Sequence, residues 1–235
     1  MGPPMRITTV GLDADDTLWH NETIFRFSQD RFRALLAEYA DEVTSSARLA
    51  EVEARNLRLY GYGVKGFTLS MIETAMELTG GDPPGRLVAE ILAAGREMLA
   101  HPVEPLPGVD AALAELSETH RLVLITKGDL LHQEQKLAAS GLGDLFAAVE
   151  IVSEKTPETY ARVFERHGSG VDRSAMAGNS VKSDVIAALD AGGWAAWIPY
   201  PITWAHEEAP TPAGHPRFAE LATISELPGW VRGLG

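Results

Sequence analysis

Acidic, hydroxyl and basic side chains follow short apolar runs at four places in this sequence of 235 residues. The runs are 6–12, 121–125, 147–152 and 174–177, and the polar residues that follow them are Asp13, Asp15, Asp16, Thr126, Lys127, Lys155, Asn179 and Asp184. Carboxylates hold divalent cations, while a hydroxyl and an ammonium neutralise phosphoryl oxygens. Brought together, these residue types would suit a divalent cation and a phosphoryl group.

The elements that must position these side chains alternate after residue 105. The predicted strands are 6–12, 121–125, 147–152, 174–177 and 194–198, and the predicted helices between them are 109–119, 130–140, 157–167 and 181–191. Short strands separated by helices of about 10–15 residues are typical of right-handed βαβ units and a parallel sheet. Ligands of such sheets bind beyond the carboxyl ends of the strands, so we expect the polar residues to meet at one edge.

A purely helical stretch interrupts this pattern after the first strand. Apolar residues recur at intervals of three and four in the segments 27–40, 45–60, 67–78 and 87–99, which is typical of amphipathic helices. The sequence therefore predicts an α/β core formed by residues 1–18 and 105–235, with a helical domain of residues 19–104 inserted into it.

The polar residues also carry a resemblance to a known family. Asp13-Ala-Asp-Asp-Thr-Leu18 resembles the DxDx[TV]L signature of the haloacid-dehalogenase-like (HAD) hydrolase superfamily. Thr126, Lys155-Thr-Pro157 and the segment 178–184 are similar to its second, third and fourth motifs, in the same order. Four ordered motifs are far more specific than one acidic cluster. The resemblance implies a Rossmann-like core in which residues 19–104 form an all-helical C1 cap.

By this resemblance Asp13 is the nucleophile, which attacks phosphorus to give an aspartyl-phosphate. Asp15 protonates the leaving oxygen and then deprotonates the water that cleaves the intermediate. Residues i and i+2 after a strand can reach one substrate from different positions, and crowded carboxylates split their pKa values, which suits these two roles. The resemblance also implies a Mg²⁺ ion held by Asp13, Asp184, Asn179 and the main-chain carbonyl of Asp15.

Thr126, Lys127 and Lys155 are the residues that the resemblance assigns to the phosphoryl oxygens. Thr126 and Lys155 would use their side chains, and Lys127 its main-chain N–H. Lys155 would also offset the repulsion between the carboxylates and a dianionic substrate. One position departs from the family pattern, because the fourth motif usually opens with Gly-Asp and here Asn179 follows the glycine. The amide removes a negative charge, so we expect weaker Mg²⁺ binding.

The sequence thus predicts a Mg²⁺-dependent phosphomonoester hydrolase acting on a small soluble metabolite. A 2-haloacid dehalogenase or a phosphonate hydrolase matches less well, because those branches lack an acid–base carboxylate at the position of Asp15. A phosphomutase would use the same acidic pair and stays open. A non-catalytic phosphate-binding protein, suggested by Asn179 alone, stays open too. In a signalling receiver domain the Lys comes last, whereas here Asp184 follows Lys155, and the long insertion also fits that class badly.

Several further residues have expected roles. Tyr60, Tyr62 and Lys65 lie in a glycine-rich segment between two cap helices and are candidates for reading the leaving group, with a plain interhelical turn as the alternative. Asp16 is expected to brace the catalytic loop, and Trp19 and His20 to pack at a hinge. The segment 206–208 lies in a Pro-rich loop and is expected to be solvated.

Composition limits the partners and the compartment. The formal charge of −13 disfavours nucleic acids and anionic membranes, and no run reaches the ~20 apolar residues of a membrane span. The absence of cysteine excludes disulfides and thiolate zinc sites and fits a reducing compartment. The N-terminus does not resemble a secretory signal, and Met1 or Met5 could be the native start. We expect a cytoplasmic monomer or homodimer whose partner is a small phosphorylated metabolite.

Overall fold

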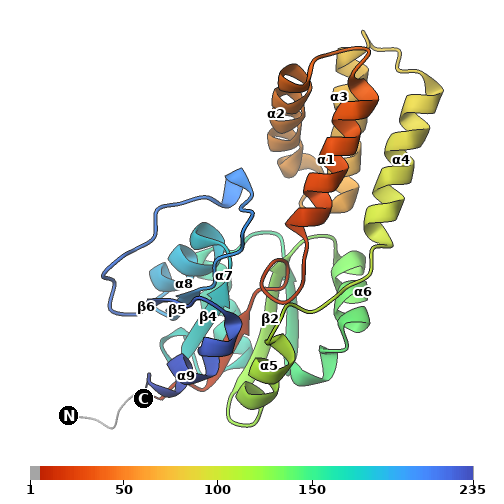
Figure 1. Ribbon diagram of the computed structural model, residues 1–235. Coiled ribbons are helices and arrows are strands. Elements are labelled where there is room, and N and C mark those ends of the chain that lie inside the picture. The colour runs from red at the N-terminus through yellow and green to blue at the C-terminus, as the bar shows by residue number, and fades with distance from the viewer. Residues whose placement is uncertain (1–5, 235) are drawn as a thin grey trace. The chain divides into compact units, whose positions relative to one another are not determined.

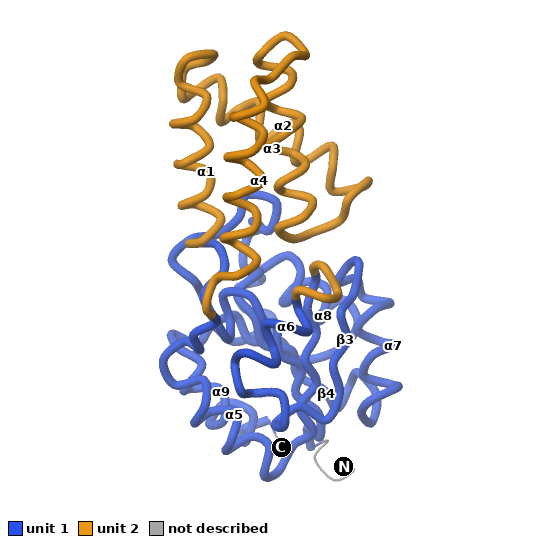
Figure 2. The backbone as a smooth tube through the Cα atoms, turned by 90° about the vertical axis from the view of Figure 1, so that its right-hand side faces the viewer, with its two compact units in different colours: residues 1–22, 103–127, 133–235 blue, residues 23–102, 128–132 orange. Residues whose placement is uncertain are grey.

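The computed structural model describes residues 6–234, which group into two compact units (Figure 2). Unit 1 contains residues 6–22, 103–127 and 133–234, and unit 2 contains residues 23–102 and 128–132. The boundaries predicted from the sequence lie after residues 18 and 104, with the segment 128–132 in the core. That segment instead groups with unit 2, where Lys65 Nζ lies 2.8 Å from Asp129 Oδ1. Among the described residues, no helix is long and apolar enough to cross a membrane.

Unit 1 is built on a six-stranded sheet with the strand order β3-β2-β1-β4-β5-β6 (Figure 1). The strands are β1 (Thr9–Leu12), β2 (Arg121–Lys127), β3 (Ala148–Val152), β4 (Ser174–Gly178), β5 (Trp194–Trp197) and β6 (Phe218–Glu220). All neighbouring strands pair in parallel, which confirms the predicted α/β class. Since β1 lies between β2 and β4, the residues that follow β1 have a strand end on either side.

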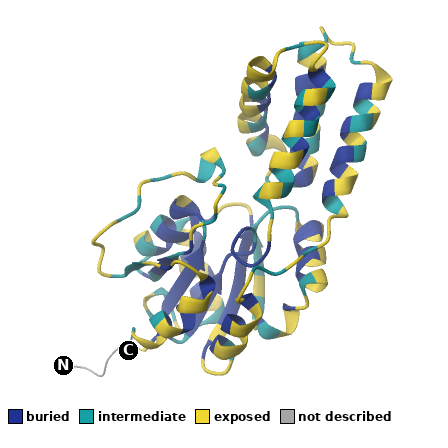
Figure 3. Ribbon diagram, viewed as in Figure 1, coloured by how far each residue is buried: buried dark blue, intermediate teal, exposed yellow. Residues whose placement is uncertain are grey.

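Helices cover both faces of this sheet. They are α5 (Val109–Ser117), α6 (Leu130–Ser140), α7 (Pro157–His167), α8 (Ala187–Asp190) and α9 (Leu227–Arg232). Residues of α5, α6 and α9 belong to one apolar core, and residues of α7 and α8 to a second one. Along β2, Leu122 and Leu124 face the first core, whereas Val123 and Ile125 face the second. This alternation buries the strand on both sides, as parallel sheets require and as Figure 3 shows.

Local sequence explains most of the element boundaries. The helix α7 begins where Thr156 Oγ1 accepts a hydrogen bond from the N–H of Thr159 at 3.2 Å, with Pro157 in the first turn. The helix predicted over 181–191 differs from the prediction, because it starts as a π-helical turn, η3 (Val181–Ile186), before continuing as α8. Such turns occur frequently at functional sites. The strand β6 and the helix α9 were not predicted because they are short and have no periodic pattern.

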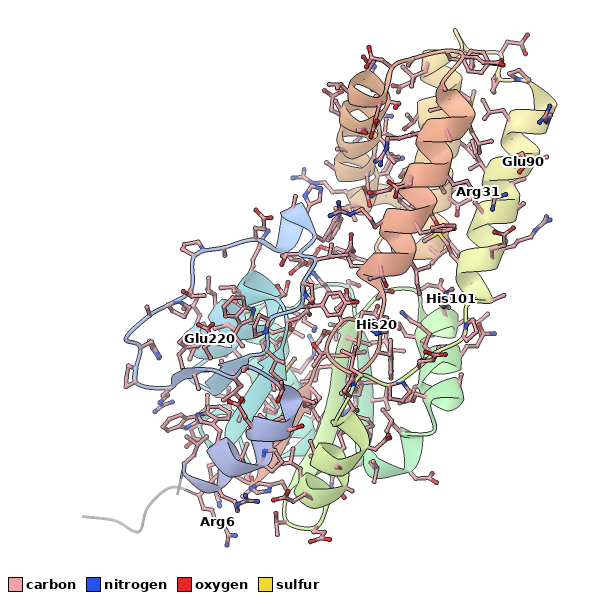
Figure 4. The ribbon with its side chains drawn as sticks, viewed as in Figure 1. Arg6, His20, Arg31, Glu90, His101 and Glu220 are labelled. Carbon is pink, nitrogen blue, oxygen red and sulfur yellow. The ribbon has the colours of Figure 1, made fainter. Side chains whose placement is uncertain are left out.

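Unit 2 is helical, as predicted. Its helices are α1 (Glu22–Leu36), α2 (Glu42–Tyr60), α3 (Val64–Leu78) and α4 (Gly85–Leu99). Their apolar faces form one core, in which the rings of Phe25 and Phe67 lie 5.1 Å apart between centroids. At the surface Arg31 of α1 lies 3.0 Å from Glu90 of α4 (Figure 4). Exposed ion pairs of this kind contribute little to stability, so the apolar core holds the helices together.

Gly11 gives a test of how tightly the sheet is packed. A Cβ atom at Gly11 would lie 2.9 Å from Phe164 Cζ and 3.0 Å from Ile125 Cδ1. We therefore expect Gly11→Ala to lower the free energy of unfolding by about 1–3 kcal/mol, as overpacked cores do. Urea unfolding followed by circular dichroism measures this loss. Gly85→Ala is the matched control, since a Cβ there meets nothing within 4 Å; equal stabilities of the two variants would contradict the prediction.

Candidate active site

Three charged side chains meet at the carboxyl ends of the strands of unit 1. Asp13 follows β1, Lys155 follows β3, and Asp184 lies in η3, which follows β4. Lys155 Nζ lies 2.5 Å from Asp13 Oδ1 and 2.7 Å from Asp184 Oδ1. The side chain of Lys155 is 2% exposed, that of Asp13 9% and that of Asp184 1%. One buried ammonium therefore binds two buried carboxylates that the sequence analysis assigned to the same site.

Burial and charge shift the pKa values in this cluster. Burial raises the pKa of Asp13 from its usual 3.8 to about 7; the charge of Lys155 opposes this rise and the charge of Asp184 adds to it. Burial also lowers the pKa of Lys155, but the charges of Asp13 and Asp184 outweigh this effect and hold it above its usual value. Lys155 is therefore a permanent cation, and Asp13 depends on nearby positive charge to stay ionised at neutral pH.

The turn after β4 allows Asp184 and Asn179 to approach this cluster. A Cβ atom at Gly178 would lie 2.1 Å from Asp184 Oδ2, so only glycine fits beside this carboxylate. The main-chain N–H of Asn179 donates to Thr17 Oγ1 at 3.1 Å. The hydroxyl of Thr17 in turn donates to Asp13 Oδ2 at 3.0 Å. Thr17 thus links the turn after β4 to the loop that carries Asp13.

The carboxylate of Asp15 has different partners from those of Asp13. Lys136 Nζ lies 2.5 Å from Asp15 Oδ1, Trp19 Nε1 donates to the same oxygen at 2.8 Å, and Gln133 Nε2 donates to Oδ2 at 2.9 Å. Burial raises the pKa of Asp15, but the charge of Lys136 and the hydrogen bonds outweigh it and leave the pKa below its usual value. Trp19, for which only packing was expected, is fully buried and also orients this carboxylate.

Gln133 and Lys136 were not identified from the sequence. They are three positions apart in the sequence and so share a face of α6. The same spacing is equally usual on a solvated helix, so it does not by itself indicate a site. Gln133 also bridges two strand-end groups, since its Nε2 donates to Thr126 Oγ1 at 3.2 Å and to the carbonyl of Lys127 at 2.7 Å. Thr126, which is buried at the end of β2, is therefore held beside Asp15.

Lys127 and Glu207 form an ion pair within unit 1. Their side chains are 13% and 15% exposed. The expectation that 206–208 is solvated is therefore wrong for Glu207, whereas the neighbouring Glu208 is exposed. The ammonium of Lys127 is likewise largely covered and paired with a carboxylate.

Asp16 braces the loop after β1, as expected. It has a positive φ of 62°, which only Asn, Asp and Gly adopt readily. Its carboxylate accepts hydrogen bonds from the N–H groups of Asn21 and Glu22 at 2.8 and 3.0 Å. These groups begin α1, where a carboxylate is favourable. Burial raises the pKa of Asp16 to about 7 although these bonds lower it. Because both of its carboxylate oxygens accept from main-chain N–H groups, Asp16 has a structural role in this loop.

The residues predicted to read the leaving group all lie in unit 2. Tyr60, at the end of α2, donates from its hydroxyl to Glu73 Oε1 at 2.8 Å. Lys65, near the start of α3, is paired with Asp129. Tyr62 is half-buried in the turn between the two helices. The three residues therefore lie in and around one turn of unit 2.

The donor set suits Mg²⁺, although no three His, Cys, Asp or Glu side chains form a metal cluster within residues 6–234. Asp13 and Asp184 direct carboxylate oxygens at the same ammonium, so both lie within reach of a single cation site. Asn179 Oδ1 lies 3.4 Å from Thr17 Oγ1, and this hydroxyl donates to Asp13 Oδ2. Mg²⁺ is commonly held by one or two carboxylates with neutral oxygens and substrate phosphate. These residues therefore fit the ion that the sequence resemblance implies.

The order and spacing of these residues match a known protein family. The model of the haloacid dehalogenase-like hydrolases matches residues 7–192, a range that contains Asp13, Asp15, Thr126, Lys155 and Asp184. The chain belongs to the haloacid dehalogenase-like hydrolases. The predicted family and the hydrolase class of this HAD protein are thereby confirmed.

Solved structures support this assignment. A haloacid dehalogenase-like family hydrolase from Xanthomonas campestris is 45% identical, with 97% of this chain and 91% of that chain covered and a TM-score of 0.87. A putative HAD-hydrolase from Bacillus subtilis, bound to magnesium, is 17% identical over 96% and 99% of the chains (TM-score 0.65). L-2-haloacid dehalogenase from Xanthobacter autotrophicus is 20% identical over 97% and 100% (TM-score 0.66). The last two show the fold alone. No curated protein matches the chain.

Removing the ammonium of Lys155 tests its structural role. Lys155→Met leaves Asp13 and Asp184 buried without their cation, so we expect the metal-free protein to lose about 3–5 kcal/mol of unfolding free energy. The pKa of Asp13 should then rise beyond about 7. A carboxyl with a raised folded-state pKa loses its stabilising contribution as the pH rises through that pKa. Urea unfolding should therefore show a larger penalty at pH 8 than at pH 5.

Lys65→Met is the control for this experiment, because its ion pair is half-exposed and should contribute no more than about 1 kcal/mol. A Lys155→Met protein as stable as that control at both pH values would show that the ammonium does not hold the carboxylates together.

Proposed function

We propose that this HAD hydrolase is a Mg²⁺-dependent phosphomonoesterase that acts on a small soluble metabolite. The observation that carries the proposal is the separation of two neighbouring carboxylates into different environments. Asp13 faces Lys155 beside a second carboxylate, whereas Asp15 accepts hydrogen bonds from Lys136, Gln133 and Trp19. Phosphomonoester hydrolysis needs one carboxylate as a nucleophile and another as acid and base.

In the first step Asp13 attacks phosphorus, and the bond between phosphorus and the leaving oxygen breaks to give an aspartyl-phosphate. Asp15, entering this step protonated, transfers its proton to the leaving oxygen. In the second step Asp15, now ionised, removes a proton from water, which attacks phosphorus and regenerates the Asp13 carboxylate. The donors around Asp15 favour its ionised form, which suits the second step. The pKa of Asp13 is raised and that of Asp15 lowered, which is the reverse of the division expected from the sequence, so the first step needs added positive charge at Asp13 and a proton on Asp15 that its present partners disfavour. Inorganic phosphate is the second product.

The phosphoryl group needs positive charge and donors close to Asp13. Lys155 supplies the buried charge, Thr126 a hydroxyl, and Lys127 its main-chain N–H. A Mg²⁺ ion held by Asp13, Asp184, Asn179 and the main-chain carbonyl of Asp15 would neutralise further charge on the phosphoryl oxygens. Tyr60, Tyr62 and Lys65 of the cap would recognise the leaving group.

Dehalogenation of a 2-haloacid is the alternative function raised by the comparisons, because L-2-haloacid dehalogenases share the fold. Asp15 argues against it, since attack on carbon with halide as the leaving group needs no proton donor. Halide release from 2-chloropropionate, measured beside phosphate release from p-nitrophenyl phosphate, separates the two functions. We further propose a cytoplasmic enzyme, active as a monomer or homodimer, since a chain without cysteine suits a reducing compartment.

Two isosteric substitutions test the roles of the carboxylates. Asp13→Asn should abolish hydrolysis of p-nitrophenyl phosphate in the presence of Mg²⁺, because an amide does not attack phosphorus. Asp15→Asn should slow hydrolysis of an alkyl phosphate by about 10²–10⁴-fold, the usual contribution of general acid–base catalysis. The loss should be smaller with p-nitrophenyl phosphate, because p-nitrophenolate is a better leaving group and needs less help from an acid. Full activity of Asp13→Asn, or equal losses of Asp15→Asn on both esters, would be inconsistent with the assigned roles.

Asn179 offers a test of the metal site that does not depend on turnover. Asn179→Asp adds a carboxylate beside the site, and a unit charge about 4 Å from a cation contributes about 1 kcal/mol even in water. Calorimetric titration should therefore show Mg²⁺ binding at least about fivefold tighter than in the wild type. Glu208→Asp, an exposed acidic position, is the control and should leave the titration unchanged. An unaltered titration for Asn179→Asp would place Asn179 away from the ion.

A further inference from the structure

The connection between β5 and β6 brings a carboxylate back to the carboxyl ends of the strands. This long connection contains a short helical turn, η4 (Ala205–Glu207), whose last residue is Glu207. Although neighbouring residues in the connection are exposed, the side chain of Glu207 is 15% exposed. Burying a charged carboxylate is unfavourable unless it is paired and hydrogen-bonded. The surroundings of Glu207 therefore indicate a specific role.

Glu207 contacts groups from two different strand ends. Its Oε1 is paired with Lys127, the last residue of β2, and its Oε2 accepts a hydrogen bond from Ser180 Oγ at 2.5 Å. Lys127 Nζ also donates to Ser183 Oγ at 3.1 Å. Ser180 and Ser183 belong to the turn after β4 and lie between Asn179 and Asp184 in the sequence. The carboxylate therefore ties the end of β2 to the turn that carries both of these residues.

This tie spans the strand of the nucleophile. In the sheet order, β1 lies between β2 and β4, so a link from Lys127 to Ser180 crosses the end of the strand that leads to Asp13. The turn itself contacts the catalytic cluster, because the N–H of Ser180 donates to Asp184 Oδ2 at 3.0 Å. Ser180 Oγ also accepts from the N–H of Ser183 at 2.9 Å. A shift of Ser180 would therefore move Asp184.

Two further contacts hold the connection in place within unit 1. Lys182 Nζ donates to the carbonyl of His206 at 3.0 Å. At the start of the connection, the hydroxyl of Tyr200 lies 2.6 Å from Nδ1 of His20, which is labelled in Figure 4 and follows the catalytic loop. The segment that carries Glu207 is thus attached to both the loop after β1 and the turn after β4.

We propose that Glu207 is a positioning residue of the active site, which holds Lys127 and the turn 180–183 so that Asp184 and Asn179 are oriented for Mg²⁺. The proposal rests on the proposed Mg²⁺-dependent function, but it concerns the geometry of the metal ligands rather than the identity of the substrate. Side chains that orient metal ligands typically change metal affinity or activity by about 10–100-fold when they are altered. Glu207 supplies this orientation from a segment that the sequence pattern did not connect with the site.

The test compares Glu207→Gln with Glu208→Gln in the full chain. The first variant keeps the shape of the side chain but loses the ion pair with Lys127, and the second changes an exposed neighbour. Calorimetric titration with Mg²⁺ alone, without substrate, should show about tenfold weaker binding for Glu207→Gln and no change for Glu208→Gln. At saturating Mg²⁺, kcat for p-nitrophenyl phosphate should recover towards the wild-type value, whereas at limiting Mg²⁺ it should fall.

Hydrogen exchange provides the second measurement. Amides of the turn 180–183 should exchange faster in Glu207→Gln, while those of α7 keep their wild-type rates. Wild-type Mg²⁺ affinity in a folded Glu207→Gln protein would overturn the proposal. If Glu207→Gln does not fold, Glu207→Asp replaces it, and wild-type Mg²⁺ affinity in that folded variant would assign Glu207 a purely structural role.

The two proposals fail in different ways. A wild-type protein that binds Mg²⁺ but hydrolyses no phosphomonoester would remove the proposed function, and weaker Mg²⁺ binding by Glu207→Gln would still support the positioning role. An active wild type with an unchanged Glu207→Gln titration would remove the positioning role alone.

Discussion

The ammonium of Lys155 keeps two carboxylates close together in the interior of unit 1, and the arrangement of the site depends on this interaction. Like charges buried side by side repel strongly, so Asp13 and Asp184 need a cation between them. The fold meets this need by placing Lys155 after β3, two strands away from β1. Gly178 then leaves space for the Asp184 carboxylate. The packing at Gly178 and the charge of Lys155 therefore both favour the observed position of the Asp184 carboxylate.

The loop after β1 gives neighbouring carboxyl groups different tasks through their surroundings. Asp13 lies against the buried cation, Asp15 accepts three donors from α6 and Trp19, and Asp16 holds the first N–H groups of α1. Asp13 and Asp16 both have pKa values of about 7, whereas the pKa of Asp15 is lowered. Residues of one type in a single short loop thus differ because tertiary partners, rather than the loop itself, determine their protonation.

The same distinction explains what the sequence could predict. The alternation of strands and helices predicted the parallel sheet, and the position of Asp13, Thr126 and Lys155 after apolar runs predicted that they meet, because strand ends are set by local pattern. Gln133 and Lys136 were not predicted as site residues. Periodicity shows that they share a helix face, but it does not show which residues that face contacts. Glu207 escaped because its partners lie far away in the sequence, in a segment without any periodic pattern. The π-helical turn at Asp184 is likewise a tertiary feature.

The central place of β1 has a consequence for the order in which the enzyme is made. The strand is synthesised first, but both of its neighbours in the sheet come much later, and Asp13 is separated from Lys155 by 142 positions in the chain. Contacts this distant in sequence form slowly, because a long loop must close before they are gained. A nascent chain therefore carries Asp13 long before it has Lys155 to pair with it. The buried cluster is complete only when the chain has been made as far as Asp184 and the sheet has closed around β1.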